Sequence, residues 1–178
     1  EYLSIADNAS LSYSGSFRIA GWLYFDSVVA AAENYWAAVA SATQYEWELQ
    51  WQTAVNRLRV HLWDTGQAAL NTVDANTLGA PALATWYFVV VWYDLGAATW
   101  NIQVNNGGVD SVAVTVTPGD KTAGFTLGTT LRGGDRLDGR MAGAIFAKRV
   151  WTAAEITWLY NSGTPRKYSE LGGGDGSA

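Results

Sequence analysis

Three polar residues lie at every second position of one short segment and could form a catalytic set. The segment YEWELQW, residues 45–51, places Glu46, Glu48 and Gln50 in step. In a β-strand these alternate side chains would share one face, with the two carboxylates close together. Paired carboxylates on either side of a glycosidic bond are the usual machinery of a glycoside hydrolase. The amide of Gln50, however, cannot give a proton to a leaving oxygen and then retrieve it.

A neighbouring strand offers a structural explanation for the same residues. The short loop QTAVN can join residues 45–51 to the alternating segment RLRVHLW, residues 57–63, as a hairpin. The register that we expect pairs polar side chains directly across the two strands: Gln50 with Arg57, Glu48 with Arg59, and Glu46 with His61. Opposite charges facing each other fix the register of a hairpin. The sequence therefore favours pairing over catalysis, with a polar binding face as the remaining alternative.

That binding face would include an aromatic ring. Trp63 falls on the same predicted face as Arg59 and His61, beside Gln50. A flat ring with several hydrogen-bonding groups around it suits a carbohydrate ligand. We therefore predict Trp63, His61, Arg59 and Gln50 as ligand-binding residues. The alternative is that Trp63 packs beneath a loop.

The sequence contains few residues that could form other catalytic sites or metal sites. The chain has no cysteine and a single histidine, which excludes thiolate chemistry and argues against zinc. It also lacks the Gly-x-Ser-x-Gly segment on which many serine hydrolases build their nucleophile. These absences leave calcium as the only metal worth considering.

Four aspartates fall at predicted strand ends or loops, where oxygen ligands can gather: Asp64, Asp94, Asp135 and Asp138. The segment GGDRLDG, residues 133–139, is the densest group, so Asp135 and Asp138 are the candidate calcium ligands. It lacks the spacing of a helix–loop–helix calcium site, and loop aspartates more often cap turns. Calcium is therefore a possible cofactor, and no other cofactor is expected.

Composition limits the class of protein. The chain of 178 residues is long enough for one domain with its own core, and ten tryptophans make it unusually aromatic. A formal net charge of −5 argues against a nucleic-acid partner. We see no uninterrupted apolar run of about 18 residues, so membrane insertion is not expected. The chain starts at Glu1 with no signal-like segment, and we expect an excised domain or a processed product.

Period-two alternation recurs along most of the chain and predicts β-strands. Strands are expected in the following segments: SFRIAGWLYF, YEWELQW, RLRVHLW, WYFVVVWY, TWNIQVN, VDSVAVTV, GFTLG and GRMAGAIFAKRV. One helix is expected in TAAEITWLYNSG, where Thr152 and Glu155 form a capping box and Gly163 ends the helix. This pattern predicts an all-β, two-sheet antiparallel jelly-roll sandwich over residues 1–164 with one short C-terminal helix. Residues 165–178 would be a tail or linker.

The order of these segments resembles a known family. The strand pattern F-x-I-x-x-W (Phe17, Ile19, Trp22) is followed by TWYFVVVWYD and then by LDGRMAGAIF and WTAAEITWLYN. Together they resemble the concanavalin A-like lectin/glucanase superfamily, in particular its laminin-G-like jelly-roll branch. Two family positions differ. Met141–Ala142 stands where the family has an apolar residue followed by Asp, so a common acidic position is lost, and Asn106–Gly107 stands where the family has an Asp-Gly hairpin tip. Both departures weaken a calcium or ligand role at those positions.

The resemblance also bears on the opening residues. The glucanase branch carries the pattern Glu-x-Asp-x-Glu on one strand, whereas this chain has Glu46-x-Glu48-x-Gln50. The missing third carboxylate predicts that the domain is not an enzyme. Glycoside hydrolysis is the least favoured of the functions considered.

We therefore expect a non-catalytic recognition module, with a glycan or a protein surface as its partner. Such a module would work in an extracellular or surface-exposed assembly: secreted, on a cell or on a virion. The alternative is a structural or decoration subunit of a virion or surface filament, packing through protein–protein contacts. A homo-oligomer is compatible with either function.

Overall fold

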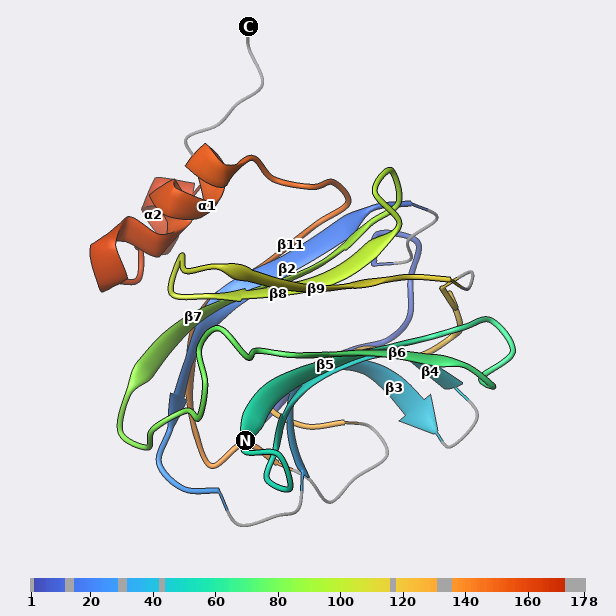
Figure 1. The fold of residues 1–178 in the computed structure, drawn as a ribbon, viewed down its shortest axis with the longest axis horizontal. Coiled ribbons are helices and arrows are strands. Elements are labelled where there is room, and N and C mark those ends of the chain that lie inside the picture. The colour runs from blue at the N-terminus through green and yellow to red at the C-terminus, as the bar shows by residue number, and fades with distance from the viewer. Residues whose placement is uncertain are drawn as a thin grey trace, which may run out of the picture.

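The structure, a computed structural model, describes residues 2–11, 15–28, 32–41, 44–115, 118–130 and 136–171. Two antiparallel sheets face each other across an aromatic core, with a short helix outside one of them (Figure 1). This confirms the predicted all-β sandwich. The helices in the described part of the chain are too short or too polar to cross a membrane.

The lower sheet of Figure 1, called sheet A, has six strands among the described residues. Their spatial order is β1 (Leu3–Ile5), β10 (Phe125–Leu127), β3 (Ala32–Ser41), β4 (Gln44–Gln52), β5 (Arg57–Trp63) and β6 (Leu70–Asp74). The first two strands are therefore contributed by segments far apart in the sequence. The hairpins β3–β4 and β4–β5 form the centre of the sheet.

The upper sheet, called sheet B, has five strands in the described ranges. Their order is β11 (Gly139–Ala147), β2 (Phe17–Phe25), β7 (Trp86–Asp94), β8 (Thr99–Val104) and β9 (Val109–Ala113). The β8–β9 hairpin turns at Asn105 and Asn106, which both have positive φ angles of 52° and 55°. Asparagine tolerates this backbone conformation, which allows a tight turn between the two strands.

The main core lies between the sheets. Alternate side chains of β2, β4, β5 and β8 are buried there, and Trp36, Trp47 and Trp100 are fully buried. Gly21 faces the ring of Trp36, where an added Cβ would lie 3.0 Å from the ring. The absence of a side chain at Gly21 therefore leaves room for one of the largest core residues.

A second core covers the outer face of sheet B. Helix α1 (Ala153–Tyr160) packs there through Ile156 and Leu159 onto Trp22 and Phe88, among others. Thr152 caps the helix and makes the predicted capping box with Glu155. The strand β7 is therefore buried on both faces, which agrees with its nearly continuous apolar sequence.

The chain continues past the helix in contact with the domain. The helix ends at Tyr160, followed by a left-handed Asn161 and the 3-10 turn η1 (Asn161–Gly163). A short helix α2 (Tyr168–Leu171) comes next, and Leu171 packs against the second core. The domain boundary at residue 164 stays a prediction.

Candidate functional site

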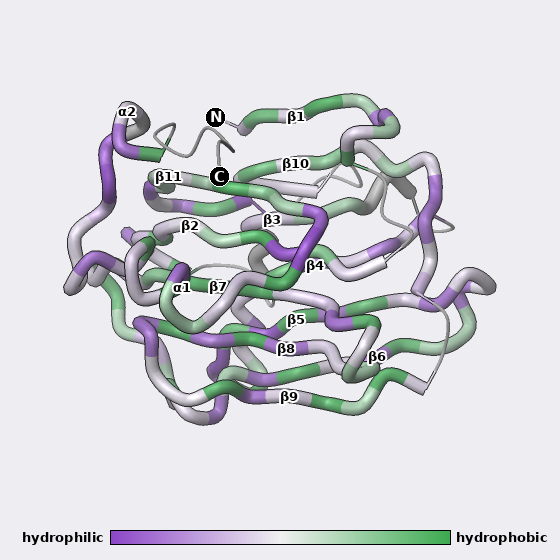
Figure 2. The backbone as a smooth tube through the Cα atoms, turned by 90° about the horizontal axis from the view of Figure 1, so that it is seen from above, coloured by the Kyte–Doolittle hydropathy of each residue, from purple (hydrophilic) through white to green (hydrophobic). Residues whose placement is uncertain are grey.

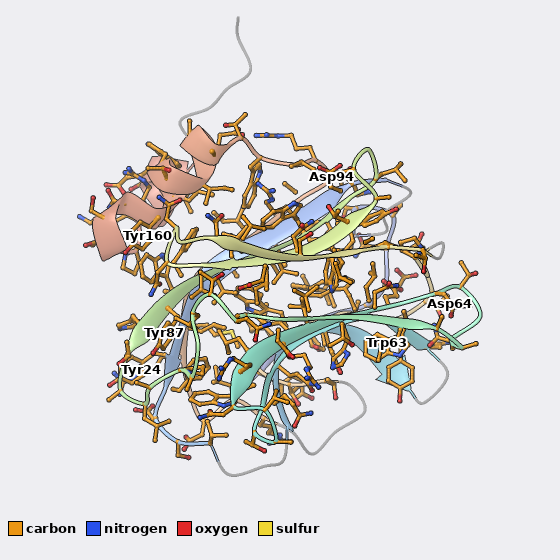
Figure 3. The ribbon with its side chains drawn as sticks, in the orientation of Figure 1. Tyr24, Trp63, Asp64, Tyr87, Asp94 and Tyr160 are labelled. Carbon is orange, nitrogen blue, oxygen red and sulfur yellow. The ribbon has the colours of Figure 1, made fainter. Side chains whose placement is uncertain are left out.

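The candidate site is the outer face of β4, β5 and β6, on the side of sheet A that faces away from sheet B. We call it the polar face. It consists of Tyr45, Glu48, Gln50, Arg59, His61, Trp63, Thr72 and Asp74. Figure 3 shows Trp63 at the right-hand end of sheet A, next to Asp64 at the strand end.

The expected pairs across the hairpin are wrong by two residues. Gln50 lies opposite Arg59 and Glu48 opposite His61, while Arg57 faces Gln52. The loop is therefore the tighter turn Thr53–Asn56, in which Asn56 adopts a positive φ of 51°. A shift by two residues preserves the face on which each side chain lies, so the predicted set of β5 residues still shares one face.

Arg59 is paired with a residue of the third strand. Its Nε and Nη2 donate to the two carboxylate oxygens of Asp74 at 2.6 and 2.9 Å. Both side chains are about four-fifths buried, and the hydrogen bonds raise the pKa of Arg59. This two-point ion pair joins β5 to β6. The expected pairing with Glu48 fails because β6 supplies a closer carboxylate.

His61 lies in the middle of a short polar chain. Its Nε2 is 2.7 Å from the amide nitrogen of Gln50, and its Nδ1 is 3.1 Å from the hydroxyl of Thr72. If Nε2 accepts from the Gln50 amide, Nδ1 carries the proton and donates to Thr72. Because His61 and Gln50 are only 8% and 4% exposed, these groups mainly hold one another in place.

Three rings form a row at the end of the polar face. The ring centroids of Tyr45 and Trp63 are 4.8 Å apart at an angle of 27°, and those of Trp63 and His61 are 5.3 Å apart. The side-chain amide of Gln67 holds the backbone of Tyr45 in a two-point contact. Trp63 and Tyr45 are only partly buried, so the row offers aromatic surface to a ligand.

Strict alternation along β4 would place Tyr45 on the same face as Trp47 and Leu49, but the structure places it on the opposite face. The β3–β4 register passes from Trp47 directly to Tyr45, which leaves Glu46 as the extra residue of a bulge. A bulge breaks the alternation of side chains along a strand. Tyr45 therefore joins the polar face, whereas Glu46 turns to a small cavity shared with Trp47 and Phe125.

Glu46 is consequently separated from Glu48 and from His61. One carboxylate oxygen of Glu46 accepts the backbone N–H of Lys121 at 2.8 Å, and the residue is 4% exposed. Burial raises the pKa of Glu46 to about 8, the Lys121 N–H opposes this, and Asp120 and Asp7 raise it further. The bulge could not be predicted from the sequence, because Tyr45 and Glu46 both fit the alternating pattern.

The aspartates proposed for calcium are largely occupied by other contacts. Asp138 accepts a hydrogen bond from the Ser27 hydroxyl, and Asp135 lies outside the described residues. Asp64 and Asp94 cap turns by accepting the backbone N–H groups of Ala68 and Ala97. No group of three or more His, Asp or Glu side chains suited to a metal ion occurs in the described ranges. Calcium at Asp135 and Asp138 stays a prediction.

Comparison with known protein families agrees with the observed fold. A laminin-G-type family profile, described as "Concanavalin A-like lectin/glucanases superfamily", matches residues 1–157. No curated protein sequence matches the chain.

Many solved structures share the architecture. One describes cell entry of botulinum neurotoxin type C through two ganglioside molecules, with 17% identity, a TM-score of 0.68, and coverage of 90% of this chain and 39% of that chain. The binding domain of botulinum neurotoxin DC in complex with SialylT has 13% identity and a TM-score of 0.68, with coverage of 90% and 39%. The binding domain of Paraclostridial Mosquitocidal Protein 1 has 13% identity and a TM-score of 0.69, with coverage of 90% and 41%. The chain thus spans about two fifths of each neighbour, and identities this low establish the shared fold alone.

Proposed function

Because the chain belongs to the concanavalin A-like lectin/glucanases superfamily, we propose that it is a non-catalytic recognition module that binds carbohydrate through the polar face. The observation that carries the proposal is the row of Tyr45, Trp63 and His61 next to the ion pair of Arg59 and Asp74. Aromatic rings next to charged hydrogen-bonding groups are the usual components of a sugar site.

In this proposal, two layers of residues have different roles. Gln50 and His61 are nearly buried and hydrogen-bonded to each other, so they act as the rigid support of the site. Direct contact with a sugar falls to the partly exposed residues Trp63, Tyr45 and Arg59. This assignment refines the predicted set of Trp63, His61, Arg59 and Gln50 by adding Tyr45 and by giving Gln50 and His61 a positioning role.

The same geometry argues against a glycosidase. The carboxylate pair of such an enzyme must reach one glycosidic bond from two sides. Here Glu46 turns away into the small cavity, and the third position is the amide of Gln50. Of the two glutamates only Glu48 lies on the polar face, and the other carboxylate there, Asp74, is held by Arg59. The proposed function is therefore binding without turnover.

The proposed ligand also suggests where the module works. Glycans are displayed on cell surfaces and secreted proteins, so we propose that the domain belongs to an extracellular or surface-exposed assembly. Among the similar structures, botulinum neurotoxin type C interacts with two ganglioside molecules, and the binding domain of botulinum neurotoxin DC forms complexes with SialylT and with rat synaptotagmin II, so either a glycan or a protein partner is chemically reasonable for this fold. The affinity for one sugar would be weak, about micromolar to millimolar, so attachment would need several copies.

A glycan array with matched tryptophan variants tests the proposal. The unmodified protein should bind a restricted set of glycans, and Trp63→Ala or Tyr45→Ala should lose that binding by tenfold or more. Trp158→Ala is the control, because Trp158 is 45% exposed on helix α1, on the other side of the sandwich. Binding that survives Trp63→Ala, or that Trp158→Ala reduces equally, would refute the polar face as the site. A protein that ignores every glycan and assembles with itself would support a structural subunit instead.

A further inference from the structure

Tyr45, the outermost ring of the polar face, lies where the ladder between β4 and β5 stops. The last pair of this ladder is Trp47 with Leu62. If the register continued, Tyr45 would come opposite Asp64, but Asp64 forms a bridge with Pro118 instead. The backbone of Tyr45 therefore needs a hydrogen-bonding partner that β5 does not supply.

The side chain of Gln67 takes the place of that missing partner. Its amide oxygen accepts the backbone N–H of Tyr45 at 2.5 Å, and its amide nitrogen donates to the backbone carbonyl oxygen of Tyr45 at 2.6 Å. Two facing residues of an antiparallel ladder exchange the same two hydrogen bonds. The amide nitrogen also donates to the carbonyl oxygen of Asp64 at 3.1 Å. One glutamine side chain thus joins the start of β4 to the loop that follows β5.

Gln67 makes this contact from a backbone conformation that favours glycine. Its φ angle is 61°, in the left-handed region. The turn is closed by the N–H of Gln67, which donates to the carbonyl oxygen of Asp64 at 3.2 Å. Glutamine is uncommon in this region, and such conformations persist only where the surrounding contacts hold them. The two hydrogen bonds to Tyr45 are contacts of this kind.

The contact fixes the ring of Tyr45 as well as its backbone. Tyr45 comes directly before the bulge at Glu46, and a bulge changes the direction of the side chains beside it. Gln67 holds Tyr45 at this irregular point, where its ring centroid lies 4.8 Å from that of Trp63. Trp63 is held separately, because its carbonyl oxygen accepts the N–H of Gly119 at 2.8 Å. The two rings therefore depend on two different loops for their placement.

We propose that Gln67 is a positioning residue of the polar face, which holds the ring of Tyr45 against Trp63 and thereby determines which glycans the face accepts. This role rests on the proposed carbohydrate-binding function. Gln67 acts through Tyr45, whose ring contacts the sugar. A binding site loses selectivity when a supporting group lets a contacting side chain move by about 1 Å.

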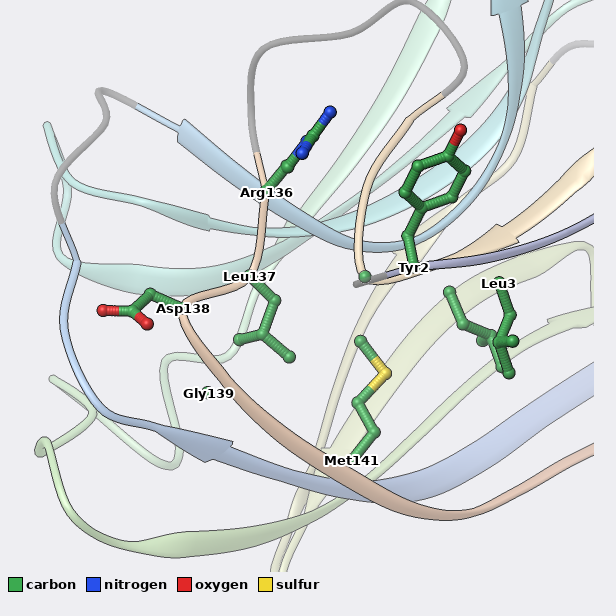
Figure 4. A pocket seen from close by; sticks show the side chains of 9 residues that line it. Tyr2, Leu3, Arg136, Leu137, Asp138, Gly139 and Met141 are labelled. Carbon is green, nitrogen blue, oxygen red and sulfur yellow. The ribbon is translucent and has the colours of Figure 1, made fainter.

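Another space in the molecule is large enough for a sugar and has to be distinguished from the polar face. A cavity of about 860 Å³ is lined by Tyr2, Leu3, Leu137 and Met141, among others (Figure 4). Figure 2 shows β1, which begins at Leu3, and β6 at opposite edges of sheet A. Gln67 lies in the loop before β6, far from this cavity along the sheet. An effect of Gln67 on binding therefore assigns the glycan to the polar face.

Gln67→Gly separates positioning from stability. Glycine removes both hydrogen bonds to Tyr45, and it also removes the backbone cost of the left-handed conformation. We expect a melting temperature close to that of the parent, with a tenfold or greater loss of binding on a glycan array. The variant should also lose the part of the near-ultraviolet circular dichroism that Trp63→Ala removes, because the two rings no longer stack.

Gln67→Glu adds a chemical test of the same contact. An ionised carboxylate accepts the N–H of Tyr45 but cannot donate to the carbonyl oxygens of Tyr45 and Asp64, whereas a protonated one can. Binding relative to the parent should therefore be weak at about pH 7 and recover as the pH falls toward about 4. Gln103→Glu is the matched control, because the amide of Gln103 donates to the carbonyl oxygen of Gly107 at 2.7 Å on sheet B. It should bind glycans as the parent does at each pH.

Several results would overturn the proposal. One is unchanged binding, or an unchanged circular dichroism signal, in Gln67→Gly. Another is a parallel loss of stability and binding with no recovery of Gln67→Glu at low pH, since Gln67 would then only hold its loop. A third is binding that Leu3→Asp reduces and Gln67→Gly does not, which would place the sugar in the cavity.

A parent protein that binds no glycan would instead refute the proposed function. The circular dichroism signal of Gln67→Gly then decides about Gln67 by itself. A lost signal supports its positioning of Tyr45, and a retained signal overturns it.

Discussion

The two outer faces of the sandwich are used in opposite ways. The outer face of sheet B is covered by helix α1 and is apolar, with Trp22, Phe88 and Trp92 buried beneath it. The outer face of sheet A carries hydrogen-bonded and charged groups with two partly exposed rings. Figures 1 and 3 show the helix, with Tyr160, on the side opposite to Trp63. The outer face of sheet B, which the chain covers with its own helix, stabilises the fold. The outer face of sheet A is the one that we propose for recognition.

The arginines of the two faces illustrate the difference. Arg18 is 1% exposed on sheet B, where its guanidinium lies 4.2 Å from the ring centroid of Trp92 and donates to the carbonyl oxygen of Trp151 at 2.8 Å. Burial lowers the pKa of Arg18 to about 10. Arg59 on sheet A instead keeps a carboxylate partner and contact with solvent. Arg18 therefore has a structural role, while Arg59 is available to a ligand.

The largest expected effect lies under the helix. Trp22 packs on Phe88 and on Tyr160, with ring centroids 5.3 and 5.9 Å apart, and is 3% exposed. Trp22→Ala should lower the free energy of unfolding by about 3–5 kcal/mol, because it leaves a large cavity in the second core. Denaturant unfolding measures this. A loss below about 1 kcal/mol would show that α1 does not form a second core with sheet B.

The next largest effect is a dependence of stability on pH, and it is caused by Glu46, which the bulge turns away from the polar face. The folded protein holds the Glu46 proton up to a pKa of about 8, whereas the unfolded chain releases it near 4.5. The folded state then binds more protons between these values, so stability falls as pH rises, by about 1.4 kcal/mol per pH unit. Glu46→Gln should remove this contribution and be more stable than the parent at pH 8.

Urea unfolding of both proteins from pH 4 to pH 9 measures the difference. The free energies of unfolding of the two proteins should be alike below pH 4.5 and should separate as the pH rises. The free energy of Glu46→Gln should fall less steeply with pH than that of the parent. Parallel curves would mean that Glu46 is solvated and ionised in the folded protein. Glu48→Gln is the control variant, because it makes the same chemical change at a glutamate that lies on the polar face instead of in the small cavity.

The sequence predicted the sheets better than the site. Alternation identified β2, β5 and β8, whose large apolar residues recur at every second position, and the nearly continuous apolar run identified β7. It missed the three-residue β1, and it missed β3 and β6. The segment AENYWAAVAS is rich in alanine, which has low β-propensity, and LNTVD is short and polar. These strands are held by their neighbours in the sheet rather than by their own composition.

Those omissions explain the errors at the site. Without β6, Asp74 and Thr72 could not be recognised as partners of Arg59 and His61. The bulge at Glu46 depends on pairing with β3, which alternation within β4 cannot reveal. A register error of two residues leaves every side chain on the same face of its strand. The prediction therefore still placed Trp63, His61, Arg59 and Gln50 on one face. Contacts between strands needed the three-dimensional structure.

A smaller effect is expected at the ion pair of the polar face. Arg59→Met and Asp74→Asn should each cost about 1–2 kcal/mol, because the pair is two-point and largely shielded from water. The double variant should lose less than the sum of the two, which a double-mutant cycle measures as coupling. Glu48→Gln combined with Arg59→Met should be additive, since β6 and not β4 supplies the partner. Coupling to Glu48 instead of Asp74 would contradict the observed pairing.

The smallest effect on stability is expected at Trp63, and it distinguishes the two faces most directly. The ring contacts Tyr45 and His61 and is only partly buried, with no helix over it. Trp63→Ala should therefore change the free energy of unfolding by about 1 kcal/mol or less, since little apolar surface is returned to water. Trp22→Ala, with the same chemical change on the other face, provides the scale.

Binding should show the reverse order. Trp63→Ala should lose glycan binding while the near-ultraviolet circular dichroism of the buried tryptophans stays unchanged. If Trp63→Ala instead destabilises the protein as much as Trp22→Ala, the ring is part of the framework and the polar face does not serve recognition. If Trp63→Ala is harmless to both stability and binding, the sugar must lie elsewhere on the sandwich. Only a stable variant that no longer binds fits a face built for a ligand.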